Sequence, residues 1–333
     1  MRKLLLTSTA LVTAASISSY AMADVSVTGA FEWTYTSTSS GVATTDGDSF
    51  STDNELTISF SNKTDSGLTL TGRYDIDADQ AGTESLDESS LTISGGFGSV
   101  TLGQDDSAND SFGIGEHDLI DEDLSSAPAN SSIVTNAGEA GNTDNNKVTY
   151  KTPAIGGFTA GYSMYDSGTA AQSTDQTAIG ASYTMPLEGG SMMIRYNKQS
   201  TDGTAALENE ASNYGAKLVM GAASVIVAHG ESTIGAGASQ TDDREANGIS
   251  LSYALGGGVK VGVSTMEATD SKDKTAAGVE EKYTANAAEV SYTIAPGLSA
   301  KFTYLDFDYK AGGETASADD SGSISQVTIS ASF

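Results

Sequence analysis

One segment of the 333-residue chain collects carboxylates without a neutralising cation. Eight of them lie within nineteen positions: Asp105, Asp106, Asp110, Glu116, Asp118, Asp121, Glu122 and Asp123. No Lys or Arg follows before Lys147. Carboxylate oxygens are the ligands that Ca²⁺ prefers, so loose calcium binding is considered at Asp105 and Asp106, or at Asp121 and Asp123. We expect no other cofactor.

Residue patterns for catalysis do not occur. The two histidines, His117 and His229, have no metal-ligating partner at helical spacing. The chain contains no G-x-S-x-G, G-x-G-x-x-G or phosphate-loop pattern. Asp75, Asp77 and Asp79 resemble the start of a calcium loop, but the required Gly and distal Glu are missing. The net charge of −28 opposes nucleic acid. We expect neither an enzyme nor a nucleic-acid partner.

The first 23 residues have the features of a secretory signal peptide. Arg2 and Lys3 precede an apolar-leaning stretch at 4–12, and Ala21-Met22-Ala23 is a small-residue cleavage site. The predicted mature domain, residues 24–333, retains 14 basic and 44 acidic side chains. An uncleaved membrane anchor is the alternative. The absence of cysteine fits an exported chain.

Apolar and polar residues alternate along most of the remaining chain, as they do in strands with one apolar face. The clearest run is the last, from Gln326 to Phe333. We count sixteen such segments, joined alternately by long polar loops and tight turns. The long loops are predicted at 37–53, 78–85, 105–146, 166–175, 200–210, 231–245, 267–284 and 310–322. The tight turns are predicted at 62–67, 95–98, 152–157, 185–190, 219–223, 254–258 and 295–297.

The fold class follows from where the apolar residues could pack. A soluble β-sandwich needs a bulky core, but the chain has 9 Phe and 1 Trp, and many apolar positions hold Ala or Gly. A propeller needs a repeat of roughly 40–50 residues, and none is found. A transmembrane barrel turns its apolar face to lipid and satisfies its backbone by closure. The sequence therefore predicts an all-β, transmembrane antiparallel barrel of 16 strands, with short periplasmic turns and long external loops.

Three motifs carry a family resemblance. These are Thr64 to Leu68 at the first tight turn, Leu91 to Gly103 before the longest loop, and the last strand ending at Phe333. With them, the mature chain resembles a sixteen-stranded general-diffusion outer-membrane porin of the alphaproteobacterial type. The resemblance implies a homotrimer in the outer membrane, with lipid and lipopolysaccharide as partners. It also implies that the third loop folds into the lumen as a constriction, and that Phe333 is an assembly signal.

The third loop in order is 105–146, so its eight carboxylates are the predicted acidic side of the constriction. Seven cations fall in the polar phase of their strands and are the predicted basic wall: Arg73, Lys147, Lys151, Arg195, Lys217, Lys260 and Lys301. A cation facing lipid would cost roughly 2–4 kcal/mol near the midplane. Acids on the loop facing bases on the wall would set up a transverse field. The alternatives are a solvated acidic surface loop and ordinary charges on a polar face.

The predicted function is a water-filled channel for passive diffusion of small hydrophilic solutes and ions, with weak cation selectivity. Two alternatives stay open. A substrate-specific channel would need an aromatic track along the lumen, whereas most Tyr residues fall in the lipid-facing phase. A structural or adhesive surface barrel would need bulkier external loops.

Overall fold

The computed structural model describes nine stretches of the chain: 24–41, 46–77, 85–120, 145–166, 175–203, 208–237, 240–274, 280–312 and 319–333. The predicted signal peptide, residues 1–23, lies outside them. Within the described stretches, no helix is long and apolar enough to cross a membrane.

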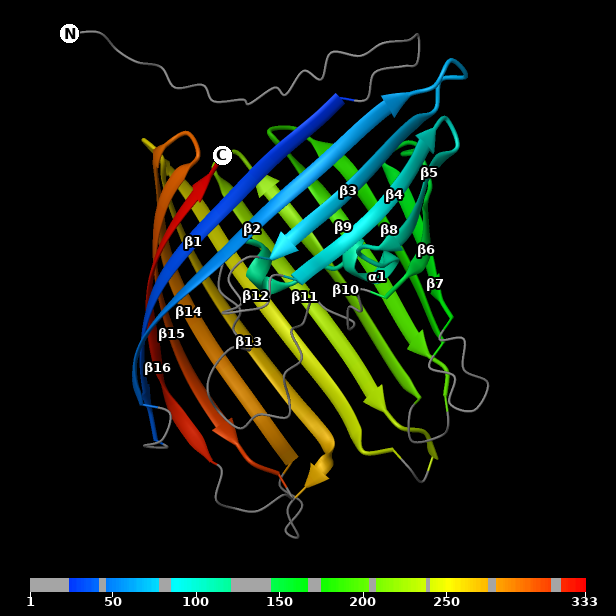
Figure 1. Ribbon diagram of the computed structural model, residues 1–333. Helices are drawn as coiled ribbons and strands as arrows, with labels where there is room; N and C mark the ends of the chain where they lie inside the picture. The colour runs from blue at the N-terminus through cyan, green and yellow to red at the C-terminus, as the bar shows by residue number, and fades with distance from the viewer. Residues whose placement is uncertain are drawn as a thin grey trace, which may run out of the picture.

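Sixteen antiparallel strands form one closed barrel, in which each strand pairs with its neighbours in sequence and β1 pairs with β16 (Figure 1). This confirms the predicted fold class. The strands are β1 (Asp24–Ser40), β2 (Gly47–Lys63), β3 (Thr69–Asp77), β4 (Ser85–Gly95), β5 (Gly98–Gln104), β6 (Lys147–Lys151), β7 (Phe158–Tyr165), β8 (Gln176–Leu187), β9 (Gly190–Thr201), β10 (Asn209–Met220), β11 (Ala223–Ile234), β12 (Asp242–Gly256), β13 (Val259–Lys274), β14 (Glu280–Ala295), β15 (Leu298–Lys310) and β16 (Asp320–Ser332). Two short helical turns, α1 (Ala108–Ser111) and η1 (Glu116–Asp118), follow β5.

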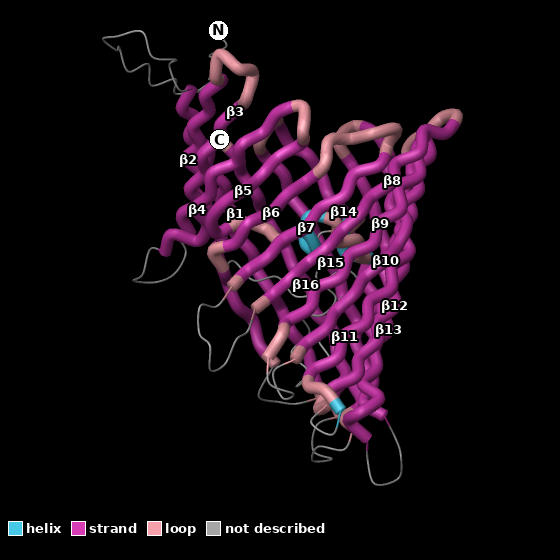
Figure 2. The backbone as a smooth tube through the Cα atoms, turned by 90° about the vertical axis from the view of Figure 1, so that its right-hand side faces the viewer, coloured by secondary structure: helices cyan, strands magenta, loops and turns pink. Residues whose placement is uncertain are grey.

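The tight turns lie where the alternation predicts them. Each of the seven predicted turns joins two consecutive strands, and Gly67, Gly189 and Gly297 supply positive φ at three of them. The carboxyl terminus lies at the rim that carries these turns, and the longer connections leave the opposite rim (Figure 1). The strands are tilted against the barrel axis (Figure 2).

Three loops are much shorter than predicted. The loop predicted at 231–245 is interrupted by strand at both ends, because β11 runs to Ile234 and β12 begins at Asp242. Most of the loop predicted at 267–284 is also strand, because β13 runs to Lys274 and β14 begins at Glu280. The first loop is also shorter, since β1 continues to Ser40 and β2 begins at Gly47.

The errors at β11 to β14 have one physical cause, a reversal of polarity along the strand. Near the tight-turn rim the outer face is apolar, as Val263 and Val290 show, and it is exposed. Toward the long-loop rim the outer face carries charges such as Glu267 and Lys282, whose side chains pair at 2.7 Å, while the inner face carries buried Tyr283. A charged segment of sequence therefore resembles a loop, although it is the part of a strand that extends beyond the apolar band.

The last residue closes the barrel seam. The Phe333 N–H donates to the Gly29 carbonyl at 2.9 Å, and the Gly29 N–H donates to the Phe333 carbonyl at 3.3 Å. The Phe333 ring is 77% exposed on the outer face. Its position agrees with the phase that the sequence gives it, and its role as an assembly signal stays a prediction.

Deleting Phe333 is expected to lower the folded fraction without changing the channel of the molecules that do fold. The deletion removes two backbone hydrogen bonds at the seam, where unpaired groups in hydrocarbon are costly. Heat-modified mobility in gel electrophoresis measures the folded fraction. Phe97→Ala, another exposed aromatic at the tight-turn rim, is the control. An unchanged folded fraction after deletion would contradict the assembly role.

Candidate functional site

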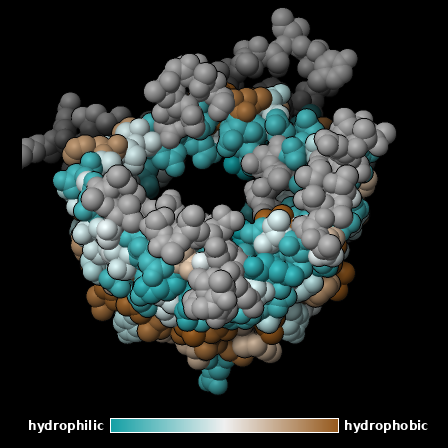
Figure 3. Space-filling view, turned by 90° about the horizontal axis from the view of Figure 1, so that it is seen from below, coloured by the Kyte–Doolittle hydropathy of each residue, from teal (hydrophilic) through white to brown (hydrophobic). Residues whose placement is uncertain are grey.

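The segment after β5 folds into the barrel. Residues 105–120 contain α1 and η1, of which α1 is in contact with β6 to β9 and η1 with β11 to β13. Figures 1 and 2 agree that these helical turns lie at mid-height inside the ring of strands. Viewed from the long-loop rim, the ring has a central opening, and the described residues at its edge are largely hydrophilic (Figure 3). The described first part of the third loop, residues 105–120, therefore narrows the lumen from one side.

Glycines on the inner wall make room for this segment. A Cβ built on five of them would lie within 2.8 Å of a loop atom: Gly161 and Gly180 against Phe112, Gly215 against Ile114, Gly248 against Glu116, and Gly262 against Ile120. At Gly180 the distances are 2.4 Å to the Phe112 ring, 2.6 Å to its Cβ and 2.7 Å to the Ala108 carbonyl oxygen. Real side chains do not approach so closely, so the loop can lie against the wall only where side chains are missing. We call these five residues the glycine row.

Three of the predicted wall cations hold the loop backbone. Lys147 donates from Nζ to the Asp105 carbonyl at 2.6 Å, and Arg195 donates to the Gly113 carbonyl at 2.6 Å. Lys260 donates from Nζ to the Leu119 carbonyl at 2.9 Å. Hydrogen bonds from charged donors are the strong ones in proteins. These cations thus lie on the loop's own side of the lumen and fasten it at three points.

Buried polar side chains that the sequence reasoning missed fasten it further. Asn213 accepts from the Ile114 N–H at 3.1 Å and donates to the Ile114 carbonyl at 3.0 Å, so it pairs with that peptide as a strand would. Asn197 donates to the Phe112 carbonyl at 3.3 Å, and the Ser163 hydroxyl accepts from the Ala108 N–H at 2.7 Å. All three side chains are almost wholly buried. In the sequence, their polar side chains in the inward phase of the strands were the signal that could have identified them.

An apolar cluster completes the contact. Ile114, Leu119 and Ile120 are buried in one group with inward side chains of β11 to β16. The wall members of that group are Ile226, Ala228, Ala246, Met266, Ala268, Tyr283, Ala285, Ala287, Leu305, Phe307, Tyr309 and Ile324. The loop is therefore held by packing as well as by hydrogen bonds.

The predicted acidic residues do not form one row. Asp110 and Asp118 line a small cavity of about 150 Å³ together with His117 and Arg195. Asp118 also accepts from the Gly115 N–H at 3.1 Å. Glu116 is fully buried over Gly248. The remaining three, Asp121, Glu122 and Asp123, lie outside the described residues.

Asp105 and Asp106 meet a carboxylate that the sequence did not single out. An oxygen of each lies within 4.8 Å of the others and of one from Glu88 on β4. Arg73 approaches the same Glu88 at 3.6 Å. Three carboxylates suit an oxygen-seeking ion, whereas the guanidinium of Arg73 competes for the same charge. Calcium binding at Asp105 and Asp106 stays a prediction, and its alternative at Asp121 and Asp123 lies outside the described residues.

The other predicted cations occupy inward positions on their strands. Arg73 on β3 pairs with Asp75 at 2.5 Å and with Glu55 at 3.8 Å. Lys151, Lys217 and Lys301 alternate with outward-facing neighbours that are exposed, namely Tyr150, Leu218 and Phe302. All seven cations thus follow the phase that the sequence assigned to them.

The wall across from the loop is acidic. In strand order β1 to β3 lie opposite the strands that α1 and η1 contact. Glu32, Asp53 and Glu55 line a hollow of about 400 Å³ there, and Asp75 is buried beside Arg73. The expected contrast of an acidic loop and a basic opposite wall is therefore not the arrangement of the described residues. Carboxylates stand on both sides, and most of the cations stand on the side of the loop.

Comparison with known proteins agrees with this architecture. A family model described as Gram-negative porin matches residues 7–312. A search of the curated proteins gave no match. Among solved structures, an anion-selective porin from Comamonas acidovorans has a TM-score of 0.70 at 16% identity, covering 94% of this chain and 100% of that one. OmpT of Vibrio cholerae in its trimer form has a TM-score of 0.69 at 11% identity, covering 93% and 99%. A mutant porin of Rh. blastica has a TM-score of 0.63 at 14% identity, covering 93% and 100%.

Gly180→Val is expected to lower the single-channel conductance in planar bilayers. Its methyl groups would occupy the space of Phe112 and Ala108, which lifts the loop off the wall into the lumen. Overpacking of this kind costs about 1–3 kcal/mol of stability. Ala181→Val is the control, because residue 181 faces outward on the same strand next to exposed Tyr183. A folded Gly180→Val barrel with normal conductance would show that the glycine row does not position the loop.

Proposed function

Because the chain belongs to the Gram-negative porin family, we propose that its outer-membrane channel serves general diffusion and prefers cations. Family and fold make it an outer-membrane β-barrel channel. The finer proposal, that small hydrophilic solutes and ions diffuse through it passively, rests on one observation. Carboxylates border the lumen on the wall and on the loop, while four cations, Arg73, Lys147, Arg195 and Lys260, are engaged by loop carbonyls or by acids.

Charge placement supports the cation preference. Arg73 is within 4 Å of three carboxylates, so its positive charge is locally outweighed. Lys147, Arg195 and Lys260 stand against the loop whose carbonyls they bind. Glu32, Asp53 and Glu55 face the lumen in one hollow, and no Lys or Arg is among the described residues that line it. Charged groups around a pore set its selectivity, and those that line this hollow are acidic.

General diffusion is favoured over a substrate-specific track. Inward aromatic residues do exist on β14 and β15, namely Tyr283, Phe307 and Tyr309. They are between 1% and 3% exposed and pack in the apolar cluster. A solute in the lumen cannot stack on rings that are covered. Membership of a channel family likewise favours transport over an adhesive or catalytic role.

The homotrimer remains part of the proposal, supported by the similar OmpT structure described as a trimer form. Light scattering of the protein extracted in mild detergent is expected to give three chain masses after subtraction of the detergent. A single chain mass in freshly extracted protein would contradict it. The alphaproteobacterial type and contact with lipopolysaccharide are further proposals from the resemblance.

Reversal potentials in a KCl gradient are expected to show cation preference that shrinks as salt rises, since the Debye length is about 10 Å at 0.1 M and shorter above. The double variant Glu32→Gln and Glu55→Gln is expected to move the potential toward anions. Neutralising Asp121, Glu122 and Asp123 tests the part of the loop outside the described residues in the same assay.

The control for this experiment is a pair of outward carboxylates. Glu210 and Glu267 pair with Lys198 and Lys282 on the outer face, so Glu210→Gln with Glu267→Gln is expected to leave the potential unchanged. An anion-preferring wild-type channel would refute the proposed selectivity. An unchanged reversal potential in the double variant of Glu32 and Glu55 would show that the acidic wall does not determine the selectivity.

A further inference from the structure

The third loop leaves the barrel wall at a sharp turn. β5 ends one residue after Gly103, whose φ is 125°. A Cβ built on Gly103 would lie 2.3 Å from the Ser89 carbonyl oxygen on β4, so a side chain has no room there. Asp105 and Asp106 follow directly. We call residues 103–106 the loop root, because the direction in which the loop enters the lumen is set at this point.

The loop root brings three carboxylates together. An oxygen of Glu88 on β4 and one each of Asp105 and Asp106 lie within 4.8 Å of one another. Asp75 on β3, which is 2% exposed, is the register partner of Glu88. Like charges at such distances repel each other strongly where water is limited. Without a positive charge nearby, the loop root would be pushed away from β4.

Arg73 on β3 brings a positive charge to this cluster. Its guanidinium lies 2.5 Å from an Asp75 oxygen, 3.6 Å from a Glu88 oxygen and 3.8 Å from a Glu55 oxygen, so it joins acids of three neighbouring strands. A single exposed ion pair contributes little, whereas a network of several charges can contribute more. The planar guanidinium with its five donors suits such a network better than a lysine would. Through Glu88, the charge of Arg73 reaches the loop root.

The other side of the loop root is held by its backbone. Lys147 on β6 donates to the Asp105 carbonyl at 2.6 Å, and the Thr149 hydroxyl donates to the Asp106 carbonyl at 3.5 Å. The Asp106 N–H donates to the Asp105 carboxylate at 2.9 Å. Toward β6 the root therefore presents carbonyls to donors, but toward β4 it presents carboxylates to a carboxylate. That second contact depends on a counter-charge.

We propose that Arg73 is a positioning residue for the constriction. By neutralising Glu88, it allows Asp105 and Asp106 to lie against β4 and so fixes the angle at which the third loop enters the lumen. The guanidinium does what a divalent cation would otherwise do between the three carboxylates. The proposal rests on the barrel being a channel with this loop inside it, and it does not depend on the preference for cations.

The test uses a thiol as a reporter of the loop root. The chain has no cysteine, so Ser107→Cys supplies a single thiol directly after the root, at a position that is 5% exposed. A neutral maleimide is expected to label it slowly, with intact mass as the readout. Adding Arg73→Gln is expected to speed labelling about tenfold, because the root then opens locally.

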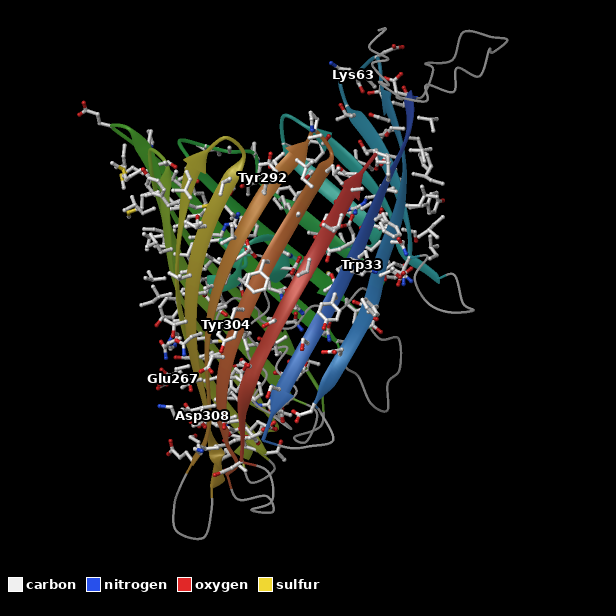
Figure 4. All side chains as sticks on the ribbon, turned by 90° about the vertical axis from the view of Figure 1, so that its left-hand side faces the viewer. Trp33, Lys63, Glu267, Tyr292, Tyr304 and Asp308 are labelled. Atoms are coloured by element: carbon white, nitrogen blue, oxygen red, sulfur yellow. The ribbon has the colours of Figure 1, made fainter. Side chains whose placement is uncertain are left out.

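A matched control removes an equally exposed cation elsewhere. Lys282 is 44% exposed, against 42% for Arg73, and it pairs with Glu267 on the outer face. Glu267 lies toward the long-loop rim (Figure 4). Lys282→Gln in the Ser107→Cys protein is therefore expected to leave the labelling rate unchanged. Equal rates in the Arg73→Gln and Lys282→Gln proteins would overturn the proposal.

Charge compensation separates positioning from a merely structural role. Arg73→Gln combined with Glu88→Gln is expected to return the labelling rate to the slow value, because the excess charge at the root is gone. If Arg73 served only buried Asp75 and the wall, this double variant would label as fast as Arg73→Gln, and the proposal would fail. Should Arg73→Gln not fold, recovery of heat-modified mobility on adding Glu88→Gln supports the same conclusion. A double variant that also does not fold would overturn it.

A chelator distinguishes the guanidinium from a bound metal ion. Labelling of the Ser107→Cys protein is expected to be the same with and without EDTA. Faster labelling in EDTA would assign the counter-charge to a divalent cation and not to Arg73. Labelling rates and reversal potentials also fail separately. An anion-preferring channel refutes the proposed selectivity and leaves this proposal standing, whereas unchanged labelling in Arg73→Gln refutes this proposal alone.

Discussion

Closure of the hydrogen-bonded ladder is the constraint on which the rest of this structure depends. A barrel wall in hydrocarbon has no water to satisfy a free strand edge, so the first and last strands must meet. They do so from Ala30 with Ser332 to Ser40 with Gly322, and Phe333 extends the seam to Gly29. Once the backbone is satisfied by closure, the side chains are freed from building a core. That freedom explains how a chain with few large apolar residues can fold, and why its interior can hold water, charges and a loop.

The interior is nevertheless not an empty tube, and the loop imposes its own requirements on the wall. A wall of ordinary side chains would keep the loop backbone several ångströms away. The glycine row removes side chains along the path of the loop, and Asn197 and Asn213 then bond the loop peptides that come within reach. Cations complete the attachment at carbonyls. The same residues cannot also stand opposite the loop as a basic wall, so the electrostatics of the lumen follow from how the loop is anchored.

Much of the fold could be predicted from the sequence, because the period of two is a direct consequence of strand geometry. This period alone predicts the sixteen strands, the seven tight turns and the inward phase of residues such as Arg195 and Lys260. The extents of β11 to β14 could not be predicted from the same pattern, since polarity on each face depends on height relative to lipid as well as on direction. Glu267 and Tyr283 look like loop residues until the level of the apolar band is known. Pairings across the barrel, such as Asn213 with Ile114 or Glu88 with Asp105 and Asp106, join residues far apart in sequence, and phase alone cannot identify them.

Because several inward cations bind the loop, substitutions at different sites change the selectivity of the channel in different ways. A cation that binds a loop carbonyl cannot be replaced by a neutral residue without loosening the loop, so substitution there alters pore width together with charge. Carboxylates on the opposite wall do not hold the loop in this way. Glu55 is exposed, and its contact with Arg73 at 3.8 Å is a surface ion pair of small value. Selectivity can therefore vary most freely at the carboxylates of β1 and β2, which are not among the groups that bind the described part of the loop. The loop-bearing side of the barrel is constrained by packing, and the opposite side is open to electrostatic change.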